Sequence, residues 1–267
     1  MTAPIARIAL LLPLLAAVPL GAQTEAPAPI QDNSFLLEEA YNQESGVVQH
    51  ISTVERAHAG GGAWGYGFTQ EWPLFGLKHQ LSYTIPLVNP GHGSSAGLGD
   101  VSVDYRYQLI GDGRSPLAVA PRVSVLLATG DEASGHGGGR MGMEGALPVS
   151  AVLAPTLVSH TNASLAFFPE GSTDIDDPGS ATQLGLGQSV VWLAHPQVNL
   201  LVEAVWERED GGDLTQESLF VSPGVRAAFD VGRVQVVPGI AVPIGLGASS
   251  GERMLFLYLS LEHAFRR

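Results

Sequence analysis

The sequence contains no cysteine, only one lysine and few charges of either sign. Without cysteine, a disulfide framework, a thiol nucleophile and a thiolate metal site are all excluded, as is the acylated N-terminal cysteine of a lipoprotein. Charged residues make up 15% of the chain, below the roughly 25% of ordinary soluble domains. The net charge of −13 repels phosphate backbones, so we expect no nucleic-acid partner.

Long apolar runs are missing beyond the N-terminus. Residues 1–22 contain one arginine, an apolar run from Ile8 to about Pro19, and the small pair Gly21 and Ala22. This arrangement predicts a secretory signal peptide that is cleaved after residue 22. No later stretch approaches the roughly 20 apolar residues of a transmembrane helix, so a membrane location would require strands.

A strict two-residue alternation is what the sequence does contain. In GLGDVSVDYRYQL, residues 97–109, every second side chain from Val101 is apolar, and Ser102, Asp104, Arg106 and Gln108 occupy the other parity. Such a strand has one apolar and one polar face. In a soluble sheet the apolar face would be the core, whereas in a membrane barrel it would meet lipid.

The alternation recurs along the whole chain and predicts twelve strands. The candidate segments are residues 46–55, 64–72, 81–87, 101–109, 119–127, 145–153, 157–168, 184–192, 198–206, 219–229, 234–242 and 255–265. An even number of strands brings both ends of the chain to one rim, and it lets the first and last strands pair without an open edge.

The connections alternate between two kinds. The predicted tight turns are residues 75–78, 111–114, 154–156, 194–197 and 230–233. The predicted longer loops are residues 57–62, 89–97, 130–141, 169–181, 209–217 and 246–252. Short periplasmic turns and long extracellular loops are typical of outer-membrane barrels. We therefore predict an all-β, closed antiparallel transmembrane β-barrel of about twelve strands, over residues 46–267, in a bacterial outer membrane.

Aromatic side chains on the apolar parity fall near the two predicted rims. Those expected at the outer rim are Trp64, Tyr66, Phe167 and Trp206, and those at the periplasmic rim are Trp72, Tyr105, Tyr107, Trp192, Phe229 and Phe265. Two aromatic girdles are expected at the interfaces of a membrane barrel. A secreted β-sandwich also has period-two strands, but it explains neither the girdles nor the alternation of short and long connections.

Prolines within the strand patterns argue against uninterrupted strands. Pro86, Pro121, Pro148 and Pro243 fit strand ends or bulges, because proline lacks the N–H that a sheet requires. For Pro223 and Pro238 the sequence offers no account.

Several strings resemble a known family of outer-membrane proteins. They are QDNSFLLEEAYNQESGVVQHI (31–51), FTQEWPL (68–74), HQLSYTIP (79–86), GLGDVSVDYRYQL (97–109), APRVSVLLATGD (120–131), ALPVS (146–150) and SPGVR (222–226). The sequence is similar to the phenol meta-pathway family, whose members are often called transporters. The resemblance implies an outer-membrane barrel tied to uptake of aromatic or hydrophobic compounds. Ala128, where the family has proline, and Arg266 and Arg267 after Phe265 depart from the expected pattern.

The polar parity of the strands would line the barrel interior. An arginine facing lipid at the bilayer midplane costs about 2–4 kcal/mol, so charged strand residues should face inward. Twelve strands lie between the filled small barrels and the open porins, so these side chains could line an aqueous path or seal the lumen by pairing. The lumen-lining candidates are Asp104, Arg106, Arg122, Glu144, Glu203, Arg226 and Glu262.

Residues 23–45 precede the first strand and form a periplasmic or plug segment. Within it, DNSFLLEEAYNQ predicts a short helix capped by Asn33 or Ser34. Phe35, Leu36 and Tyr41 would give that helix a small apolar stripe. The helix could insert into the lumen as a plug or lie at the periplasmic rim.

Candidate catalytic sets are sparse. His50 and Ser52 share one strand face, as do His160 and Asn162, but no GxSxG, HExxH or phosphate-loop motif is present. A lipid hydrolase would need serine, histidine and an orienting group together on the lipid side. The acidic loop GSTDIDD (171–177) lacks EF-hand spacing and fits a solvated loop better than a metal site.

The sequence therefore predicts a passive channel or uptake protein for small aromatic or hydrophobic solutes. We expect no catalytic residues, metal or cofactor, and contact with outer-membrane lipid and lipopolysaccharide. Two alternatives stay open, an outer-membrane lipid hydrolase and a structural barrel with a sealed lumen. The oligomeric state is not determined by the sequence.

Overall fold

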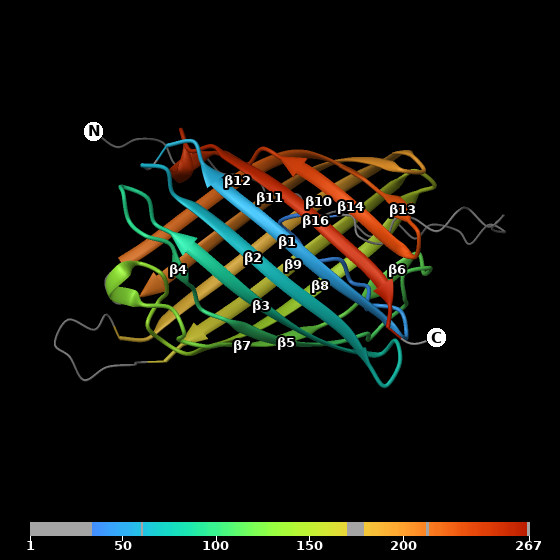
Figure 1. The fold of residues 1–267 in the computed structure, drawn as a ribbon, viewed down its shortest axis with the longest axis horizontal. Coiled ribbons are helices and arrows are strands. Elements are labelled where there is room, and N and C mark those ends of the chain that lie inside the picture. The colour runs from blue at the N-terminus through green and yellow to red at the C-terminus, as the bar shows by residue number, and fades with distance from the viewer. Residues whose placement is uncertain (1–33, 60, 170–178, 212–213, 266–267) are drawn as a thin grey trace, which may run out of the picture.

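The computed structural model describes residues 34–59, 61–169, 179–211 and 214–265, and these form one closed barrel of tilted strands (Figure 1). The predicted signal peptide and the acidic loop 171–177 lie outside the described residues. The strands are β1 (Val47–Ala57), β2 (Trp64–Leu74), β3 (His79–Asn89), β4 (Gly97–Leu98), β5 (Ser102–Tyr107), β6 (Leu117–Val119), β7 (Arg122–Leu126), β8 (Gly142–Ala154), β9 (Leu157–Phe168), β10 (Ala181–His195), β11 (Val198–Gly211), β12 (Leu214–Ala227), β13 (Phe229–Val231), β14 (Val234–Ala241), β15 (Ile244–Gly245) and β16 (Met254–Ala264). Two 3₁₀ turns, η1 (Glu132–Ser134) and η2 (Gly247–Ser249), lie in loops.

The sixteen segments make up twelve barrel strands, because four strands are each interrupted once. The interrupted strands are β4 with β5, β6 with β7, β12 with β13, and β14 with β15. All pairings are antiparallel, and β1 pairs with β16 from Val47↔Ala264 to Ala57↔Met254. This seam between the first and last strands closes the sheet and confirms the predicted twelve-stranded barrel.

Short turns gather at one end of the barrel and the longer loops at the other (right and left in Figure 1). We call these the short-turn end and the loop end. The prediction differs from the structure in two connections. The predicted tight turn at 111–114 belongs to a longer connection, because β5 ends at Tyr107 and β6 begins at Leu117.

The predicted long loop at 209–217 is wrong, because β11 runs to Gly211 and β12 begins at Leu214. Arg208 forms ion pairs there with Asp210 on the same strand (2.7 Å) and with Glu217 across the hairpin (3.4 Å). These three residues have the outward parity of their strands, and their side chains are 42–46% exposed. Outward-facing ion pairs need water, so this part of the hairpin extends beyond the apolar belt.

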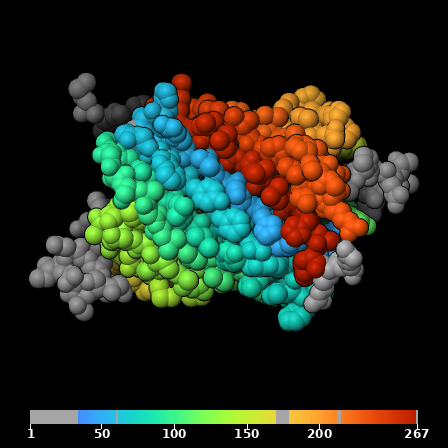
Figure 2. All heavy atoms as spheres, viewed as in Figure 1, coloured from blue at the N-terminus to red at the C-terminus, as the bar shows by residue number. Residues whose placement is uncertain are grey.

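Apolar side chains cover the outside of the barrel. On β16 the outward parity is Leu255, Leu257, Leu259 and Leu261, each between 37% and 40% exposed. Figure 2 shows the wall around β16, β1, β2 and β3 as continuous, with its side chains packed from strand to strand. The aromatic residues predicted for the girdles share this outward parity, including Trp192 and Phe265 at the short-turn end.

Strand prolines lie beside interruptions of the hydrogen-bonded ladder. Pro86 lies between the β3 residues that pair with β4 and those that pair with β5. Pro121 separates β6 from β7, and Pro148 faces that same interruption through its carbonyl, which accepts the Ala120 N–H. Since proline cannot donate to a ladder, the strands are broken where these residues sit.

The same rule accounts for the two prolines that the sequence left open. Pro243 separates β14 from β15, and Pro223 on β12 lies opposite this gap, where its carbonyl accepts the Val242 N–H at 3.0 Å. Pro238 lies one residue beyond Arg226↔Gly239, the last pair between β12 and β14. Both prolines therefore lie beside gaps in the strand pairing, where the N–H group that proline lacks is not needed for a sheet hydrogen bond.

In the part of the chain that the structure describes, no helix is long and apolar enough to cross a membrane.

A charge placed on the outer surface at mid-strand should destabilise the barrel in a depth-dependent way. Leu259→Arg, at the middle of β16, is expected to cost about 2–4 kcal/mol of unfolding free energy in lipid vesicles. Phe265→Arg at the rim is the matched control, with an expected cost of about 0–1 kcal/mol. Urea unfolding measures both values, and equal costs would contradict a membrane-embedded outer face.

Candidate functional site in the barrel lumen

Residues 34–45, which we call the lumen segment, lie inside the barrel. They contact inward-facing side chains from β3 and β5 on one side and from β8 to β12 on the other. The predicted helix is wrong over the described part, because residues 34–45 consist of irregular backbone with a few bends and one turn. Side chains of the barrel wall accept hydrogen bonds from the backbone N–H groups of the segment. In a helix these N–H groups would instead bond to carbonyl groups of the segment itself.

Backbone donors of the lumen segment are paired one after another with side chains of the barrel. Glu203 accepts the N–H groups of Phe35 (3.1 Å) and Leu36 (3.2 Å). The remaining acceptors are Asn162 for Glu38 (2.8 Å), Ser150 for Ala40 (2.8 Å), Gln108 for Asn42 (2.9 Å) and Gln80 for Gln43 (2.7 Å). Such a series holds the segment in one register, because each buried N–H would be costly without its acceptor.

Phe35 fills an apolar pocket in the lumen wall. Its ring lies 5.6 Å from the ring of Phe256 and 5.3 Å from that of Tyr258. A Cβ on Gly239 would lie 2.3 Å from the Phe35 ring, and one on Gly224 would lie 2.8 Å from it. Glycine at these two inward positions therefore leaves the space that the phenylalanine occupies.

Arg106 on β5 is a buried cation that contacts both the lumen segment and the barrel wall. Its guanidinium donates to Asn42 Oδ1 (3.0 Å) and to the carbonyls of Glu39 (3.2 Å) and Tyr41 (2.7 Å). It also forms ion pairs with Glu38 (3.6 Å) and Glu71 (3.7 Å), and its side chain is only 8% exposed. The planar fork of arginine suits such multiple contacts, and it holds the segment against β2 and β5.

Arg122 on β7 forms a second ionic cluster. Its guanidinium pairs with Asp104 (2.8 Å), with Glu144, and with Glu38 of the lumen segment (2.8 Å). Three carboxylates thus surround one cation that is 17% exposed. This cluster ties the segment to β5, β7 and β8.

The structure places the remaining lumen candidates on the inner wall at different positions. Arg226 stacks on the rings of Phe35 (5.2 Å) and Tyr258 (5.0 Å) and lies 3.7 Å from Glu39. Glu203 is fully buried beneath Phe35 and Leu36, and Glu262 lines a cavity beside the segment. Leu36 packs on the Phe256 cluster, whereas Tyr41 lies edge-on to the His160 ring at 6.2 Å.

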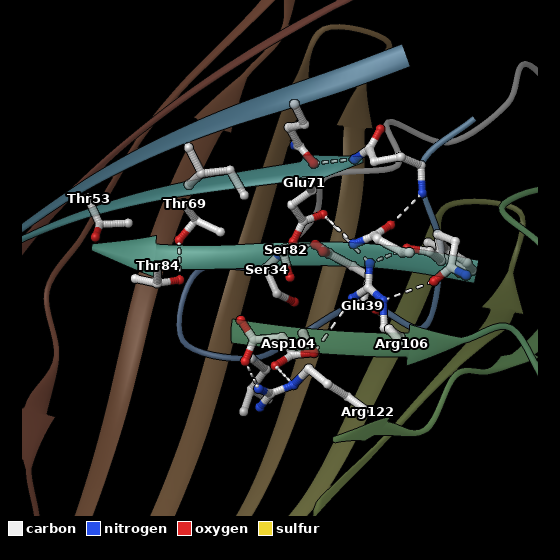
Figure 3. Close-up of a pocket in the computed structure, with 18 of the residues that line it drawn as sticks. Ser34, Glu39, Thr53, Thr69, Glu71, Ser82, Thr84, Asp104, Arg106 and Arg122 are labelled. Atoms are coloured by element: carbon white, nitrogen blue, oxygen red, sulfur yellow. Dashed lines mark hydrogen bonds and ion pairs between the residues drawn. The ribbon is translucent and has the colours of Figure 1, made fainter. Parts of the chain in front are cut away.

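A cavity of about 260 Å³ remains beside the lumen segment (Figure 3). Hydroxyl side chains of Thr53, Thr69, Thr84 and Ser82 line one wall, and Phe35, Ile51 and Tyr258 add apolar surface. Glu71, Asp104, Arg106 and Arg122 point into the same space from β2, β5 and β7. The segment therefore restricts the lumen without filling it.

The histidine–serine pairs do not form a catalytic arrangement on the lipid side. Ser52 Oγ lies 3.3 Å from Tyr66 Oη, and His50 Nε2 instead lies 3.3 Å from His263 Nε2. His160 is bonded to Ser150 at 2.7 Å, but both side chains are fully buried in the lumen, where Ser150 also accepts the Ala40 N–H. His160 and Asn162 therefore help to hold the lumen segment.

Sequence reasoning missed most side chains that cradle the segment. Gln80, Gln108, Ser150 and Asn162 all share the inward parity of their strands, so a search for polar inward positions would have found them. Nothing in the sequence indicates that Gly224 and Gly239 leave the space that the Phe35 ring occupies. These contacts join residues about two hundred positions apart in the sequence.

Comparison with known proteins supports the fold. No family model matches the sequence, and no curated protein matches it. Among solved structures, the COG4313 outer membrane channel from Pseudomonas putida F1 is similar with a TM-score of 0.63 and 11% sequence identity, covering 86% of this chain and 99% of the other. The KdgM porin is similar with a TM-score of 0.52 and 10% identity, covering 82% and 99%. The chain thus has the fold of outer-membrane barrels.

Proposed function

We propose that this protein is a passive outer-membrane channel for small solutes, and that the lumen segment sets the width of its passage. The observation that carries this proposal is the cavity left between the segment and the walls of β16, β1, β2, β3, β5 and β7. The barrel similarity to an outer membrane channel and a porin supports the same class of function. Membership of the phenol meta-pathway family stays a prediction from the sequence.

The chemistry of the cavity favours small aromatic solutes that carry a hydroxyl or a positive charge. Tyr258 and Phe35 offer aromatic surface on one side, and the threonines of β1, β2 and β3 offer hydrogen bonds on the other. Aromatic faces and hydroxyls together suit an aromatic ring with a polar substituent.

The charge of the inner wall disfavours anions. Among the described strand residues of inward parity, three are arginines, namely Arg106, Arg122 and Arg226, and nine are acidic. The acidic residues are Glu55, Glu71, Asp104, Glu144, Glu203, Glu207, Glu209, Asp230 and Glu262. An excess of carboxylates repels anionic solutes and attracts cations.

The proposed alternative of a lipid hydrolase finds no support in the geometry, because Ser52 and His50 each pair with another residue. A sealed structural barrel would be shown by the absence of any ion current.

Block of the ion current by added solutes tests both the channel and its preference. In planar bilayers, benzyl alcohol and benzylammonium should interrupt the current more strongly than benzoate or a sugar alcohol of similar size. Tyr258→Ser should weaken block by the aromatic solutes several-fold, because the ring that they contact is lost. Leu255→Ala on the outer face is the control, since its side chain faces away from the lumen.

If the protein shows no conductance in planar bilayers, the proposed channel function is wrong. A measurable conductance with equal block by all four solutes would contradict only the aromatic and cationic preference.

A further inference from the structure

Two histidines face each other on the outer surface of the barrel, where the first strand meets the last. His50 on β1 and His263 on β16 occupy the outward parity near the short-turn end. Their Nε2 atoms lie 3.3 Å apart, with ring centroids separated by 5.4 Å and planes inclined by 26°. The Phe68 ring stacks against His50 at 6.2 Å and supports its orientation.

The second nitrogen of His263 has its own partner. Its Nδ1 lies 3.2 Å from the carbonyl oxygen of Ala264, which can only accept a hydrogen bond. This contact places the proton on Nδ1 and leaves a lone pair on Nε2, the atom that faces His50. A backbone carbonyl that fixes the tautomer in this way is the usual outer contact of a metal-binding histidine.

The spacing of the two rings matches the bite of a tetrahedral metal ion. With Zn–N bonds of about 2.0–2.1 Å and an angle of about 109°, two imidazole nitrogens on one ion lie about 3.3–3.4 Å apart. The observed separation of 3.3 Å falls at this value, so an ion could enter without a change of backbone. Without metal, a hydrogen bond from His50 Nε2–H to His263 Nε2 accounts for the same distance.

We propose that His50 and His263 form a two-histidine site for a transition-metal ion of the zinc, nickel and copper class. Imidazole favours these ions over Mg²⁺ and Ca²⁺, which prefer oxygen ligands. Over the described ranges no group of three or more potential metal ligands occurs, so the protein supplies two ligands and solvent completes the coordination. Because the two ligands come from β1 and β16, a bound ion cross-links the first and last strands, whose pairing closes the barrel.

Binding is tested with tag-free protein folded in detergent, since a histidine tag would bind the same ions. Co²⁺ serves as a spectroscopic probe of a low-symmetry nitrogen site, and Zn²⁺ competition gives the affinity. One ion should bind per chain, and His50→Gln or His263→Gln should each raise Kd at least tenfold. Zn²⁺ should also raise the unfolding temperature of the wild type but of neither variant, because it links the two seam strands.

His79→Gln is the matched control. His79 also faces outward near the short-turn end, but its Nδ1 pairs with Tyr105 Oη at 2.6 Å. This variant should keep both the affinity and the thermal shift of the wild type. The proposal is overturned if the wild type and His50→Gln bind Zn²⁺ with equal affinity, or if His79→Gln weakens Zn²⁺ binding as much as His50→Gln does. It is also overturned if Zn²⁺ binding leaves the unfolding temperature of the wild type unchanged.

Discussion

Deletion of residues 34–43 is expected to raise the single-channel conductance several-fold. The deleted stretch carries the backbone groups that bond to Glu203, Asn162, Ser150, Gln108 and Gln80, and it occupies much of the lumen section. Without it, the side chains of the inner wall would be hydrated in a wider passage. Ion flow through a narrow pore increases with its open cross-section, so the current measured in planar bilayers should increase.

A variant of unchanged length controls for effects of shortening the chain. Replacing residues 34–43 by glycine and serine removes Phe35, Glu38 and Tyr41 but keeps ten residues before the first strand. Such a flexible stretch has no side chains for the apolar pocket or the ionic clusters, so it should also conduct more than the wild type. If both variants conduct like the wild type, the passage does not run along the lumen segment.

Arg106→Ala is expected to have the largest effect of any single substitution in the lumen. The change removes hydrogen bonds to Asn42, Glu39 and Tyr41 and leaves Glu38 and Glu71 without this cation. Breaking a buried ion pair by removing one partner typically costs about 3–5 kcal/mol. We expect a loss of about 3 kcal/mol in unfolding free energy and a noisier, larger ion current as the segment loosens.

Two further variants separate the clamp from general charge effects. Arg106→Lys keeps the charge but not the planar fork, so it should recover only part of the stability. Arg208→Ala removes an arginine that is 42% exposed at the loop end, and exposed pairs contribute about 0–1 kcal/mol. If Arg106→Ala has the same unfolding free energy and the same current noise as Arg208→Ala, the contacts of Arg106 do not hold the lumen segment in place.

Much of the fold could be predicted because a barrel strand repeats its environment every two residues. Val101, Val103, Tyr105 and Tyr107 alternate with Ser102, Asp104 and Arg106, and the structure has the first set outside and the second inside. The same parity rule placed the arginines of β5, β7 and β12 on the inner wall. Each of these predictions depends only on neighbouring residues of one strand.

The candidate site was harder to predict because it joins residues that are distant in sequence. Local capping rules favour a helix after Asn33, yet Glu203, Asn162 and Ser150 accept the N–H groups that this helix needs. Hydrogen bonds from strands more than a hundred residues away outweigh a weak local preference.

The sequence by itself therefore determined the barrel, the number of strands and the inward position of the charged lumen candidates. These features follow from a short-range repeat and from the cost of exposing charge to lipid. Only the tertiary structure decided how the lumen is occupied, what remains open beside Arg106 and Arg122, and which histidines meet at the seam. Those outcomes depend on which strands pair across the closed sheet and on a segment whose conformation is set by the wall around it.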